Sequence, residues 1–512
     1  MEGMTAKPNA GARFLRAVPA MPRSVGRCLH AGAVWACVAM LLVCGVPARA
    51  STALEDKIES IVSAGKLAKA QVGVHVVALG SGRIIYARNA NRKFIVASNQ
   101  KLITAATALE TLGEDYEFRT VVSARGSVAK GELTHDLVLR GGGDPSIGGQ
   151  YDEESASTIF RRWAGVLKAR GLRRVRGDVV GDDTFFDGVS RHPEWSSYPA
   201  WKWYYTPVSA LSVNDNCVTI KVEPAAGSSG PARLSISPGS APVRVRNVCK
   251  TSGSRHAIWF DREPYSDVIK VGGYVRRGTN GYTHDVSVPN PCSYAAFVFK
   301  RALEDEGISV DGRARTATRR EGEPPRAGMP LCERRAALVP ILRTMVKRSH
   351  NHYAEQVIKT VGAEASGTGS WEAGLAQAAR MLNRIGASSE EFELDDGSGL
   401  SRRNRVPPAL LTALLLHMAG SEHDSTYRSL LAVAGQDGTL SRRLTEEPYA
   451  GNVLAKTGYL DGVGALSGYA TTRSGVWVAF SILINDTENP PGTYSMRTAL
   501  DSVCRAIVDL AE

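Results

Sequence analysis

The stretch FIVASNQKLITAATALETLG, residues 94–113, places Ser98 and Lys101 three positions apart where an apolar segment turns into a helix. A serine hydroxyl is a weak nucleophile and needs a base. A lysine amine can be that base when burial or nearby cations loosen its proton. Because positions i and i+3 share a face of a helix, the pair indicates nucleophilic catalysis, although a serine in such a place is as often only a helix cap.

Ser-x-x-Lys occurs three times in this chain, so the spacing alone carries little information. Ser63 and Lys66 fall at the end of an amphipathic segment, next to a glycine. Ser127 and Lys130 fall in a glycine-flanked hairpin, where residues three apart point to opposite sides. Only Ser98 is expected at a helix N-terminus, where free amides favour negative charge.

Two further short motifs follow Ser98 along the chain. Ser-His-Asn, residues 349–351, lies between two amphipathic stretches, and Lys-Thr-Gly, residues 456–458, ends a predicted strand. A second Ser-x-Asn, residues 212–214, lies mid-chain without that setting. Ser-x-x-Lys, Ser-x-Asn and Lys-Thr-Gly in this order are typical of penicillin-recognising serine enzymes.

Catalysis of this kind gives each motif residue a role. Lys101 should face Lys456, and each charge should lower the pKa of the other amine. Ser349 would relay a proton between Lys101 and the leaving amine, while Asn351 would hold the lysine and the substrate amide.

The strand that ends in Lys-Thr-Gly should flank the substrate. Gly458 would let a substrate backbone lie close to it. The backbone N–H of Tyr459 and that of Ser98 should form an oxyanion hole, in which loss of one donor typically costs about 3 kcal/mol.

Hydrophobic periodicity predicts an α+β fold in which strands from both ends of the chain form one antiparallel sheet. Helices would cover this sheet, and Ser98 would lie on a helix packed against it. The expected elements are a helix at 54–65, a hairpin at 71–90, strands at 452–460, 464–473 and 476–486, and a last helix ending near 510.

The middle of the chain should be an insertion. The predicted catalytic domain comprises residues 51–116 and 326–512, and the inserted domains comprise residues 117–325. Within them we expect a hairpin at 119–140, an amphipathic helix at about 155–170, a strand at 173–180 and a strand-rich run to 289.

A length of 512 residues predicts two or more hydrophobic cores. A content of 43% hydrophobic and 22% charged residues is typical of a globular protein. The first fifty residues carry six Lys/Arg and one Glu, so the rest of the +11 charge is a mild +6. This suits work near an anionic polymer. Without a block of alternating basic and aromatic residues it does not indicate nucleic-acid binding.

The N-terminus has the pattern of a secretory signal peptide. Arg23 and Arg27 precede an apolar run at 31–46 and then Pro-Ala-Arg-Ala. We therefore expect cleavage after Ala50, export to the periplasm and no stable membrane anchor afterwards.

Five cysteines remain after such cleavage, and an exported chain can form disulfides. Cys217 with Cys249 is the first pairing to expect, because both lie in the same middle region. No cysteine spacing resembles a zinc site. His350 and His352 diverge on a helix and lack a third ligand, so no metal or cofactor is expected.

Over nearly all of the mature chain, the sequence resembles D-alanyl-D-alanine carboxypeptidase/endopeptidases of the penicillin-binding protein 4 type, the low-molecular-mass class C penicillin-binding proteins. The resemblance implies a β-lactamase/transpeptidase-like domain with a large, strand-rich insertion of two small domains. The 251 positions from Ser98 to Ser349 (349 − 98) fit that insertion and not a class A β-lactamase. Beyond the catalytic motifs, the resemblance rests on NRKFIVASNQKLITAATAL, LVLRGGGDPSIG, VRGDVVGDDTFFD, YTPVSALSVNDNCV, HNHYAEQVIKTVG, DDGSGLSRRNRVPP and GQDGTLSRRL.

Carried over by motif, the resemblance implies that Ser98 is acylated with Lys101 as its base, and that the site is completed by Ser349, Asn351 and Lys456. Thr457 would bind the terminal carboxylate of the substrate. Asp182, or the adjacent Asp183, would hold a diaminopimelate ammonium group.

Two positions depart from the family pattern. His350 stands where relatives often have Asp, at a variable position. Tyr459 stands where Thr usually helps to grip the substrate carboxylate, so carboxypeptidase activity could be weaker than endopeptidase activity.

The resulting hypothesis is a periplasmic serine hydrolase of peptidoglycan stem peptides that cleaves D-Ala–D-Ala or the cross-link bond through an acyl-Ser98 ester, which β-lactam antibiotics should trap. The alternatives are a β-lactamase and a non-catalytic peptidoglycan-binding protein of the same fold, with Tyr459 as the sign of a decayed site. The segments DDGSGLS and GQDGTLSRR are interpreted as loops near the catalytic face, whose arginines could contact the wall.

Overall fold

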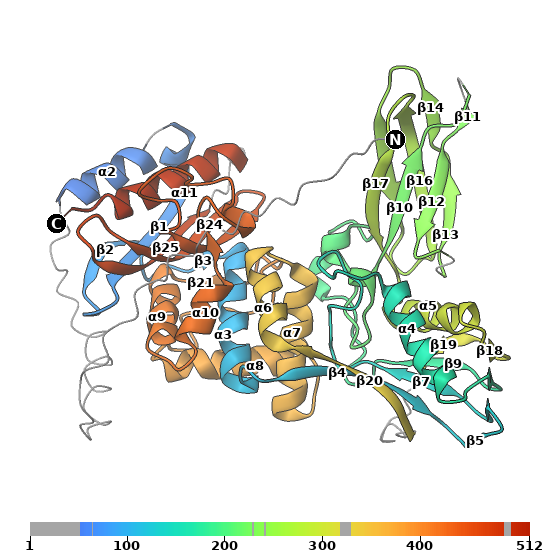
Figure 1. Cartoon of the computed structure of the whole chain (residues 1–512). Coiled ribbons are helices and arrows are strands. Elements are labelled where there is room, and N and C mark those ends of the chain that lie inside the picture. Colours follow the sequence, from blue (N-terminus) through green and yellow to red (C-terminus); the bar gives the residue numbers. More distant parts are fainter. Residues whose placement is uncertain are drawn as a thin grey trace, which may run out of the picture. The chain divides into compact units, whose positions relative to one another are not determined.

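Strands from both ends of the chain meet in one six-stranded sheet, as predicted (Figure 1). Its order is β2-β1-β25-β24-β23-β22, and all neighbours are antiparallel. The strands are β1 (Gln71–Ala78), β2 (Ile84–Arg88), β22 (Ala432–Val433), β23 (Leu454–Leu460), β24 (Val463–Thr471) and β25 (Trp477–Asn485). The structure, a computed structural model, describes residues 52–63, 65–227, 230–239, 242–317, 329–485 and 493–511.

Side chains alternate between the two faces of this sheet, as strand geometry requires. On β25, Phe480 and Ile482 belong to a core shared with α2 (Thr52–Val62) and α11 (Thr493–Val508), which lie side by side in Figure 1. Ala479 and Leu483 belong to the core on the other face. The helices of that face are α3 (Gln100–Leu112), α6 (Leu338–Lys347), α7 (Asn351–Ser366), α8 (Trp371–Arg384), α9 (Pro408–Ala419) and α10 (Asp424–Leu430).

The strand-rich insertion forms two groups of sheets, in agreement with the predicted fold class. One group has the sheets β19-β9-β7-β4-β20 and β18-β8-β6-β5 with helices α4 (Ala156–Ala169) and α5 (Pro291–Asp305). Its strands are β4 (Glu117–Ala124), β5 (Val128–Ala129), β6 (Glu132–Leu133), β7 (Leu137–Arg140), β8 (Arg174–Val175), β9 (Val179–Asp182), β18 (Ser309–Val310), β19 (Ala314–Thr316) and β20 (Met329–Ala337). The limits 117–325 themselves stay a prediction.

The second group has the sheets β12-β10-β17 and β11-β14-β16-β13, with β15 also paired to β16. Its strands are β10 (Cys217–Glu223), β11 (Gly230–Pro231), β12 (Arg233–Ser237), β13 (Arg244–Asn247), β14 (Lys250–Ser252), β15 (Ala257–Asp261), β16 (Val268–Arg276) and β17 (Tyr282–Ser287). Short 3₁₀ helices link many elements: η1 (Gly65–Lys69), η2 (Ala97–Asn99), η3 (Pro193–Trp195), η4 (Trp203–Tyr205), η5 (Asn214–Asn216) and η6 (Gly438–Leu440).

One prediction for the insertion was wrong, and one helix was missed. The single strand expected at 173–180 is two strands, β8 and β9, in different sheets. The chain crosses between the sheets at Gly177, where a Cβ would lie 2.5 Å from the backbone of His135. Helix α5 was not predicted at all, although the Asn290 side chain accepts a hydrogen bond from the N–H of Ser293, and Pro291 occupies the first turn.

The expected disulfide is also wrong. Cys217 and Cys249 are both buried and unbonded, and Cys292, Cys332 and Cys504 carry free thiols as well. Cys217 begins β10, whereas Cys249 precedes β14 of another sheet. Hydrogen bonds link these sheets without a disulfide, such as the bond from Arg262 to Ser287 Oγ of β17 and the bond from Asn247 Nδ2 of β13 to the carbonyl of Ala232.

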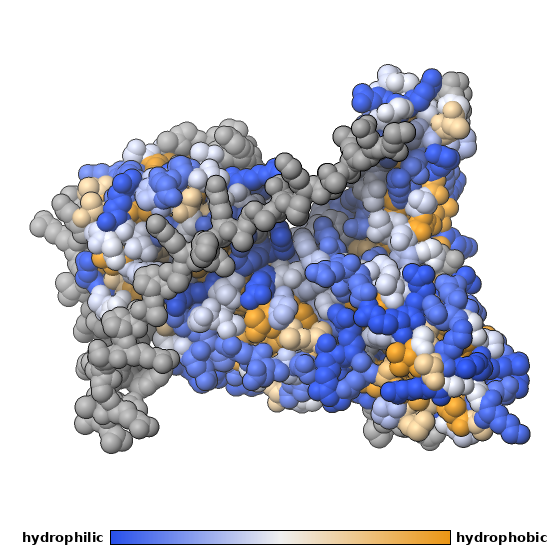
Figure 2. Space-filling view, viewed as in Figure 1, coloured by the Kyte–Doolittle hydropathy of each residue, from blue (hydrophilic) through white to orange (hydrophobic). Residues whose placement is uncertain are grey.

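The predicted signal peptide lies outside the described residues. Within those residues, no helix has the length and apolar character needed to span a bilayer. Figure 2 shows a mostly hydrophilic face on which apolar side chains gather in separate small patches.

Strands β23 and β24 pack so closely at Gly468 that a side chain at this position would clash with the backbone of β23. A Cβ on Gly468 would lie 2.0 Å from the carbonyl oxygen of Leu454 and 2.6 Å from the Cα of Ala455. We expect Gly468→Ala to lower the free energy of unfolding by about 1–3 kcal/mol because backbone atoms must move. Urea unfolding measures this.

The matched control is Gly464→Ala on the same strand. Its Cβ would meet only side chains, the nearest atom being Leu500 Cδ1 at 3.3 Å. We expect a change below about 1 kcal/mol. Equal losses in the two variants would contradict the close fit of β23 and β24.

Candidate active site

Ser98 lies in a turn that is fastened to the central sheet. The preceding strand β3 (Phe94–Ile95) pairs with β21 (Arg405–Val406). The Asn485 side chain accepts from the N–H of Ile95 at 2.9 Å and donates to its carbonyl at 3.0 Å. Ala97 has a φ of +46°, a left-handed conformation that is uncommon for a residue with a Cβ. The turn η2 then leads into α3, so Ser98 stands just before a helix as predicted.

Lys101 is fully buried, and its Nζ contacts three oxygen atoms. These are Ser98 Oγ at 3.1 Å, Asn351 Oδ1 at 2.7 Å and the carbonyl of Ser398 at 2.7 Å. The last two can only accept hydrogen bonds, whereas a hydroxyl can also donate. A neutral amine has two hydrogens and one lone pair. It therefore gives both hydrogens to these two acceptors and turns its lone pair toward Ser98.

Asn351 is itself oriented by the inserted segment. Its Nδ2 donates to the carbonyl of Tyr204 at 3.2 Å, which leaves Oδ1 facing Lys101. An amide turned the other way would place its NH₂ group against Lys101 and its oxygen against the carbonyl oxygen of Tyr204, and the bond to Tyr204 would be lost. The direction of the lone pair on Lys101 therefore depends on a residue outside the catalytic helices.

Burial lowers the pKa of Lys101 to about 7, because the charged amine is removed from water. The negative charges of Glu355 and Asp396 act in the opposite direction and raise it. A substantial fraction of the amine is therefore neutral near neutral pH, which is the form that can accept a proton.

The loop that presents the Ser398 carbonyl is built on two buried carboxylates. Glu355 accepts hydrogen bonds from the N–H groups of Gly397 and Ser398 and from Trp371 Nε1. Asp396 accepts from four donors: the N–H groups of Gly399 and Ser401, Asn404 Nδ2 and Trp195 Nε1. These bonds fix the position of the carbonyl that Lys101 contacts.

Glu355 is a site residue that the sequence reasoning missed. Its only signal is that it lies four residues after Asn351, one turn along α7 and on the same face. Burial and then the charge of Asp396 raise its pKa to about 8. The segment DDGSGLS is thus a structural loop, as interpreted, and also the support of Lys101.

Ser349 and Lys456 form the second pair of the site. Ser349 has a φ of +60° at the turn before α7. Lys456 Nζ donates to Ser349 Oγ at 2.9 Å and to the carbonyl of Thr457 at 2.7 Å. Burial and then the positive charge of Lys101 hold the pKa of Lys456 well below its ordinary value, as predicted. For Lys101, by contrast, burial is the cause of the lowered pKa.

Strand β23 lies directly against the segment that carries Ser98. Asn99 Nδ2 donates to the carbonyl of Lys456 at 3.0 Å. A Cβ on Gly458 would lie 3.0 Å from the carbonyl oxygen of Val96 and 3.2 Å from the Cβ of Ala97. The glycine therefore permits close packing of two catalytic segments, a purpose that the sequence reasoning had not assigned to it.

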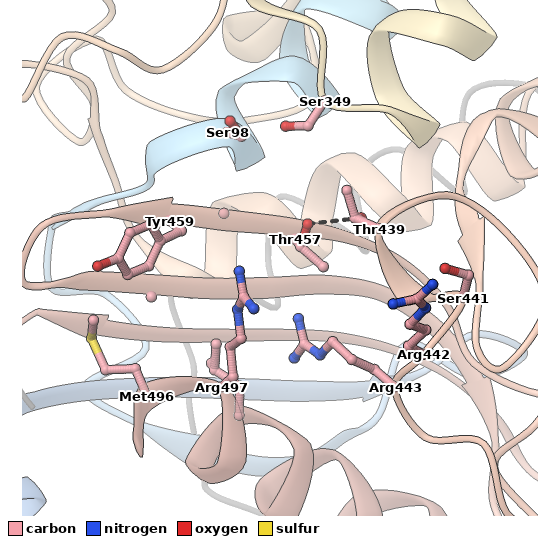
Figure 3. Close-up of a pocket in the computed structure, with 13 residues that line it drawn as sticks. Ser98, Ser349, Thr439, Ser441, Arg442, Arg443, Thr457, Tyr459, Met496 and Arg497 are labelled. Atoms are coloured by element: carbon pink, nitrogen blue, oxygen red, sulfur yellow. Dashed lines mark hydrogen bonds between the residues drawn. The ribbon is translucent and has the colours of Figure 1, made fainter. Parts of the chain in front are cut away.

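Two cavities meet at Ser98. The first, which we call the arginine arm, is lined by Ser349, Thr457 and Tyr459 and by Arg442, Arg443 and Arg497 (Figure 3). The second, the tyrosine arm, is lined by Asn351, Tyr459 and Tyr198, Tyr204 and Tyr205 of the insertion. The side chain of Tyr459 is 42% exposed and borders both arms.

Asp182 is placed elsewhere. It lines a different cavity, with Tyr116, Arg140 and Glu364, and none of the motif residues borders that cavity. Its Oδ1 accepts from the N–H and hydroxyl of Thr184. The role proposed for Asp182 in holding a diaminopimelate ammonium stays a prediction.

The second Ser-x-Asn segment packs against the catalytic one. Ser212 Oγ accepts from Gln356 Nε2 of α7. Asp215, in a left-handed conformation with a φ of +51°, has Oδ1 3.6 Å from Nε2 of the buried His350. The other two Ser-x-x-Lys pairs lie away from this site, since Ser63, Ser127 and Lys130 are exposed.

His350 and His352 do not share a metal site with a third residue. Over the described part of the chain, no three His, Cys, Asp or Glu side chains are grouped to hold a metal ion. Burial lowers the pKa of His352 to about 3, so its ring is neutral.

Comparison with known proteins gives consistent matches. Residues 54–506 match the D-Ala-D-Ala carboxypeptidase 3 (S13) family. The chain is 34% identical over 460 residues to a D-alanyl-D-alanine carboxypeptidase of Actinomadura sp. (strain R39), covering 86% of this chain and 82% of that one. It is 27% identical over 421 residues to the D-alanyl-D-alanine carboxypeptidase DacB of Haemophilus influenzae, covering 81% and 85%.

Solved structures agree with the predicted fold. Penicillin binding protein 4 from Haemophilus influenzae has a TM-score of 0.76 at 24% identity, covering 88% of this chain and 99% of that one. The same protein complexed with a novel β-lactam has a TM-score of 0.71 at 23% identity, covering 89% and 100%. At this level of identity the matches establish the shared fold.

The loop under Lys101 should depend on Asp396. We expect Asp396→Ala to lower the free energy of unfolding by about 3 kcal/mol or more, because it leaves four buried donors without their acceptor. Urea unfolding followed by tryptophan fluorescence measures the change.

Asp395→Ala is the matched control, since the adjacent carboxylate is 21% exposed and its Oδ2 lacks a hydrogen-bond partner. We expect it to cost less than about 1 kcal/mol. A loss for Asp396→Ala no larger than that of the control would show that this carboxylate does not support the loop.

Proposed function

The chain belongs to the D-Ala-D-Ala carboxypeptidase 3 (S13) family, and we propose that Ser98 is the nucleophile with which it cleaves its substrates. It is a serine-type D-Ala-D-Ala carboxypeptidase, and we propose that it also acts as an endopeptidase on peptidoglycan peptides. The observation that carries the assignment of Ser98 is the environment of Lys101. Two acceptor-only contacts at 2.7 Å leave the amine lone pair for the Ser98 hydroxyl at 3.1 Å.

The proposed acylation begins with transfer of the Ser98 hydroxyl proton to Lys101. The Ser98 oxygen then attacks the carbonyl carbon of the D-Ala residue that precedes the scissile bond. The N–H groups of Ser98 and Tyr459 are proposed to bind the oxyanion that forms. When the intermediate collapses, the C–N bond breaks and an ester links the acyl group to Ser98.

The leaving amine needs a proton, which Lys101 has just acquired. We propose that it passes through the hydroxyl of Ser349, whose Oγ is kept in position by Lys456 at 2.9 Å. Because burial and Lys101 depress the pKa of Lys456, that amine can also exist in neutral form and tolerate a second cation nearby. Water then attacks the ester, with Lys101 again as base, and releases the shortened peptide.

Thr457 is proposed to bind the carboxylate at the end of the substrate, and Asn351 the substrate amide. Thr457 Oγ1 donates its one hydroxyl hydrogen to Thr439 Oγ1 at 2.8 Å, so this hydrogen must rotate toward the cleft to bind the carboxylate. A β-lactam carries a comparable amide and carboxylate, so it should acylate Ser98 and be released slowly.

Export to the periplasm is proposed from the basic and apolar N-terminal segment, with residues 51–512 as the mature chain. The proposed substrate, the stem peptide of the cell wall, lies in that compartment. Residues 51–116 with 326–512 are proposed as the catalytic domain and residues 117–325 as the inserted domains. A penicillin-labelled species of the full 512 residues in the cytoplasm would contradict export.

Covalent labelling tests the nucleophile. Fluorescent penicillin is expected to label the wild type and not Ser98→Ala, because the variant lacks the attacking oxygen. Ser127→Ala, which removes the serine of an exposed Ser-x-x-Lys pair, is the matched control and should be labelled normally. Labelling of Ser98→Ala would remove Ser98 from the mechanism.

The fate of the label separates the alternatives. A label that persists for many minutes is expected of a peptidase, whereas rapid loss with penicillin turnover would indicate a β-lactamase. Absence of label from every variant, wild type included, would indicate a binding protein without catalysis.

The pH dependence of acylation tests the base. The second-order rate constant for labelling is expected to rise with pH and to reach half its maximum near pH 7, since only neutral Lys101 accepts the proton and its pKa is about 7. Stopped-flow or gel-based labelling between pH 5 and 10 measures this. A rate that keeps rising toward pH 10 would show that Lys101 keeps an ordinary pKa.

A further inference from the structure

The arginine arm, which Ser98 also lines, carries positive charge from two arginines that no carboxylate of the described residues balances. Arg443 forms a two-pronged ion pair with Asp501, at 2.7 and 3.1 Å, so its charge is balanced. Arg442 and Arg497 are exposed, and neither is ion-paired with any residue of the described part of the chain. No Asp or Glu is among the described residues that line this cavity. Figure 3 shows Arg442 and Arg497 among the lining side chains, with Thr457 between them and the two serines, Ser98 and Ser349.

The tyrosine arm differs in charge. Glu194 and Asp461 line it together with Arg402 and the tyrosines. The two sides of Ser98 therefore have different electrostatic character, and only the arginine arm selects for anions.

The arginine arm lies on the leaving-group side of the scissile bond if Thr457 binds the terminal carboxylate. Thr457 lines the arginine arm and not the tyrosine arm, whereas Asn351 lines the tyrosine arm and not the arginine arm. In this chain, Tyr459 occupies the position at which a threonine hydroxyl would help Thr457. A guanidinium group can compensate, because its planar donors pair with a carboxylate through two parallel hydrogen bonds.

We propose that Arg442 and Arg497 bind carboxylates of the leaving peptide, so that the arginine arm selects cross-linked stem peptides over peptides that release a single D-alanine. This deepens the proposed function and rests on it. Removal of one D-alanine places one carboxylate on the leaving side, which Thr457 can take. Cleavage of a cross-link leaves a whole stem peptide there, with additional carboxylates farther from the bond. Two unpaired arginines beyond Thr457 match that second kind of leaving group.

Three substrates test the proposal: a pentapeptide ending in D-Ala-D-Ala, a cross-linked dimer muropeptide, and the same dimer with its leaving-side carboxylates amidated. The wild type is expected to cleave the free-acid dimer with a higher kcat/KM than the amidated dimer. In Arg442→Gln and Arg497→Gln, the ratio of kcat/KM for the free-acid dimer to kcat/KM for the amidated dimer should fall about tenfold. This fall should come mainly from KM and is equivalent to about 1.4 kcal/mol.

Two variants serve as controls. Arg343→Gln removes an exposed arginine of α6 that borders none of the cavities described here, and it should keep the wild-type ratio. Arg497→Lys keeps the positive charge and should recover part of the ratio, though not all, because an ammonium cannot form the paired contact. Raising the salt concentration should reduce the wild-type ratio, since exposed charges are screened.

The outcomes separate two kinds of failure. If the wild type cleaves all three substrates and both glutamine variants keep the wild-type ratio, the arginine arm does not recognise leaving-side carboxylates. The same conclusion follows if activity falls equally on the free-acid and amidated dimers. If the wild type cleaves none of the substrates and takes no penicillin label, the proposed function itself is wrong.

Discussion

The site depends on one buried amine whose hydrogen bonds are fully assigned. Lys101 has no contact with solvent, and two of its three partners cannot donate. Removing the amine from water lowers its pKa to about 7, and the two acceptors then fix where the lone pair points. The same burial would be prohibitive for an ammonium group without partners. The lowered pKa of Lys101 and the direction of its lone pair toward Ser98 thus follow from a single environment.

That environment requires buried acidic side chains and strained backbone that other parts of the chain must stabilise. Glu355 and Asp396 are fully buried, and seven donors satisfy them. Ala97 and Ser349, each adjacent to or part of a catalytic motif, have left-handed backbone conformations. Such conformations persist only where surrounding packing and hydrogen bonds over-determine them. The loop after α8 provides such hydrogen bonds around Glu355 and Asp396, and Asn485 of β25 provides them at Ile95, before Ala97.

The inserted segment supplies contacts that hold residues of the candidate active site in place. Trp195 donates to Asp396, and the carbonyl of Tyr204 orients Asn351. Phe186 and Trp195 also join Ile358 and Trp371 of the catalytic helices in one hydrophobic cluster. The insertion also supplies Tyr198, Tyr204 and Tyr205 to the lining of the tyrosine arm. It gives the two sides of Ser98 their different chemistry.

The sequence by itself determined the strands and helices of the central sheet through their hydrophobic periodicity. It also determined the order of the three motifs and favoured Ser98 over the other two Ser-x-x-Lys serines. These features depend on residues that are close together in the chain. The sequence did not determine helix α5, the break at Gly177, the absence of a Cys217–Cys249 bond or the role of Glu355. Those features depend on contacts between residues far apart in the chain. Lone-pair direction, burial and the charge of each arm are set only when such segments meet, so the tertiary structure alone decided them.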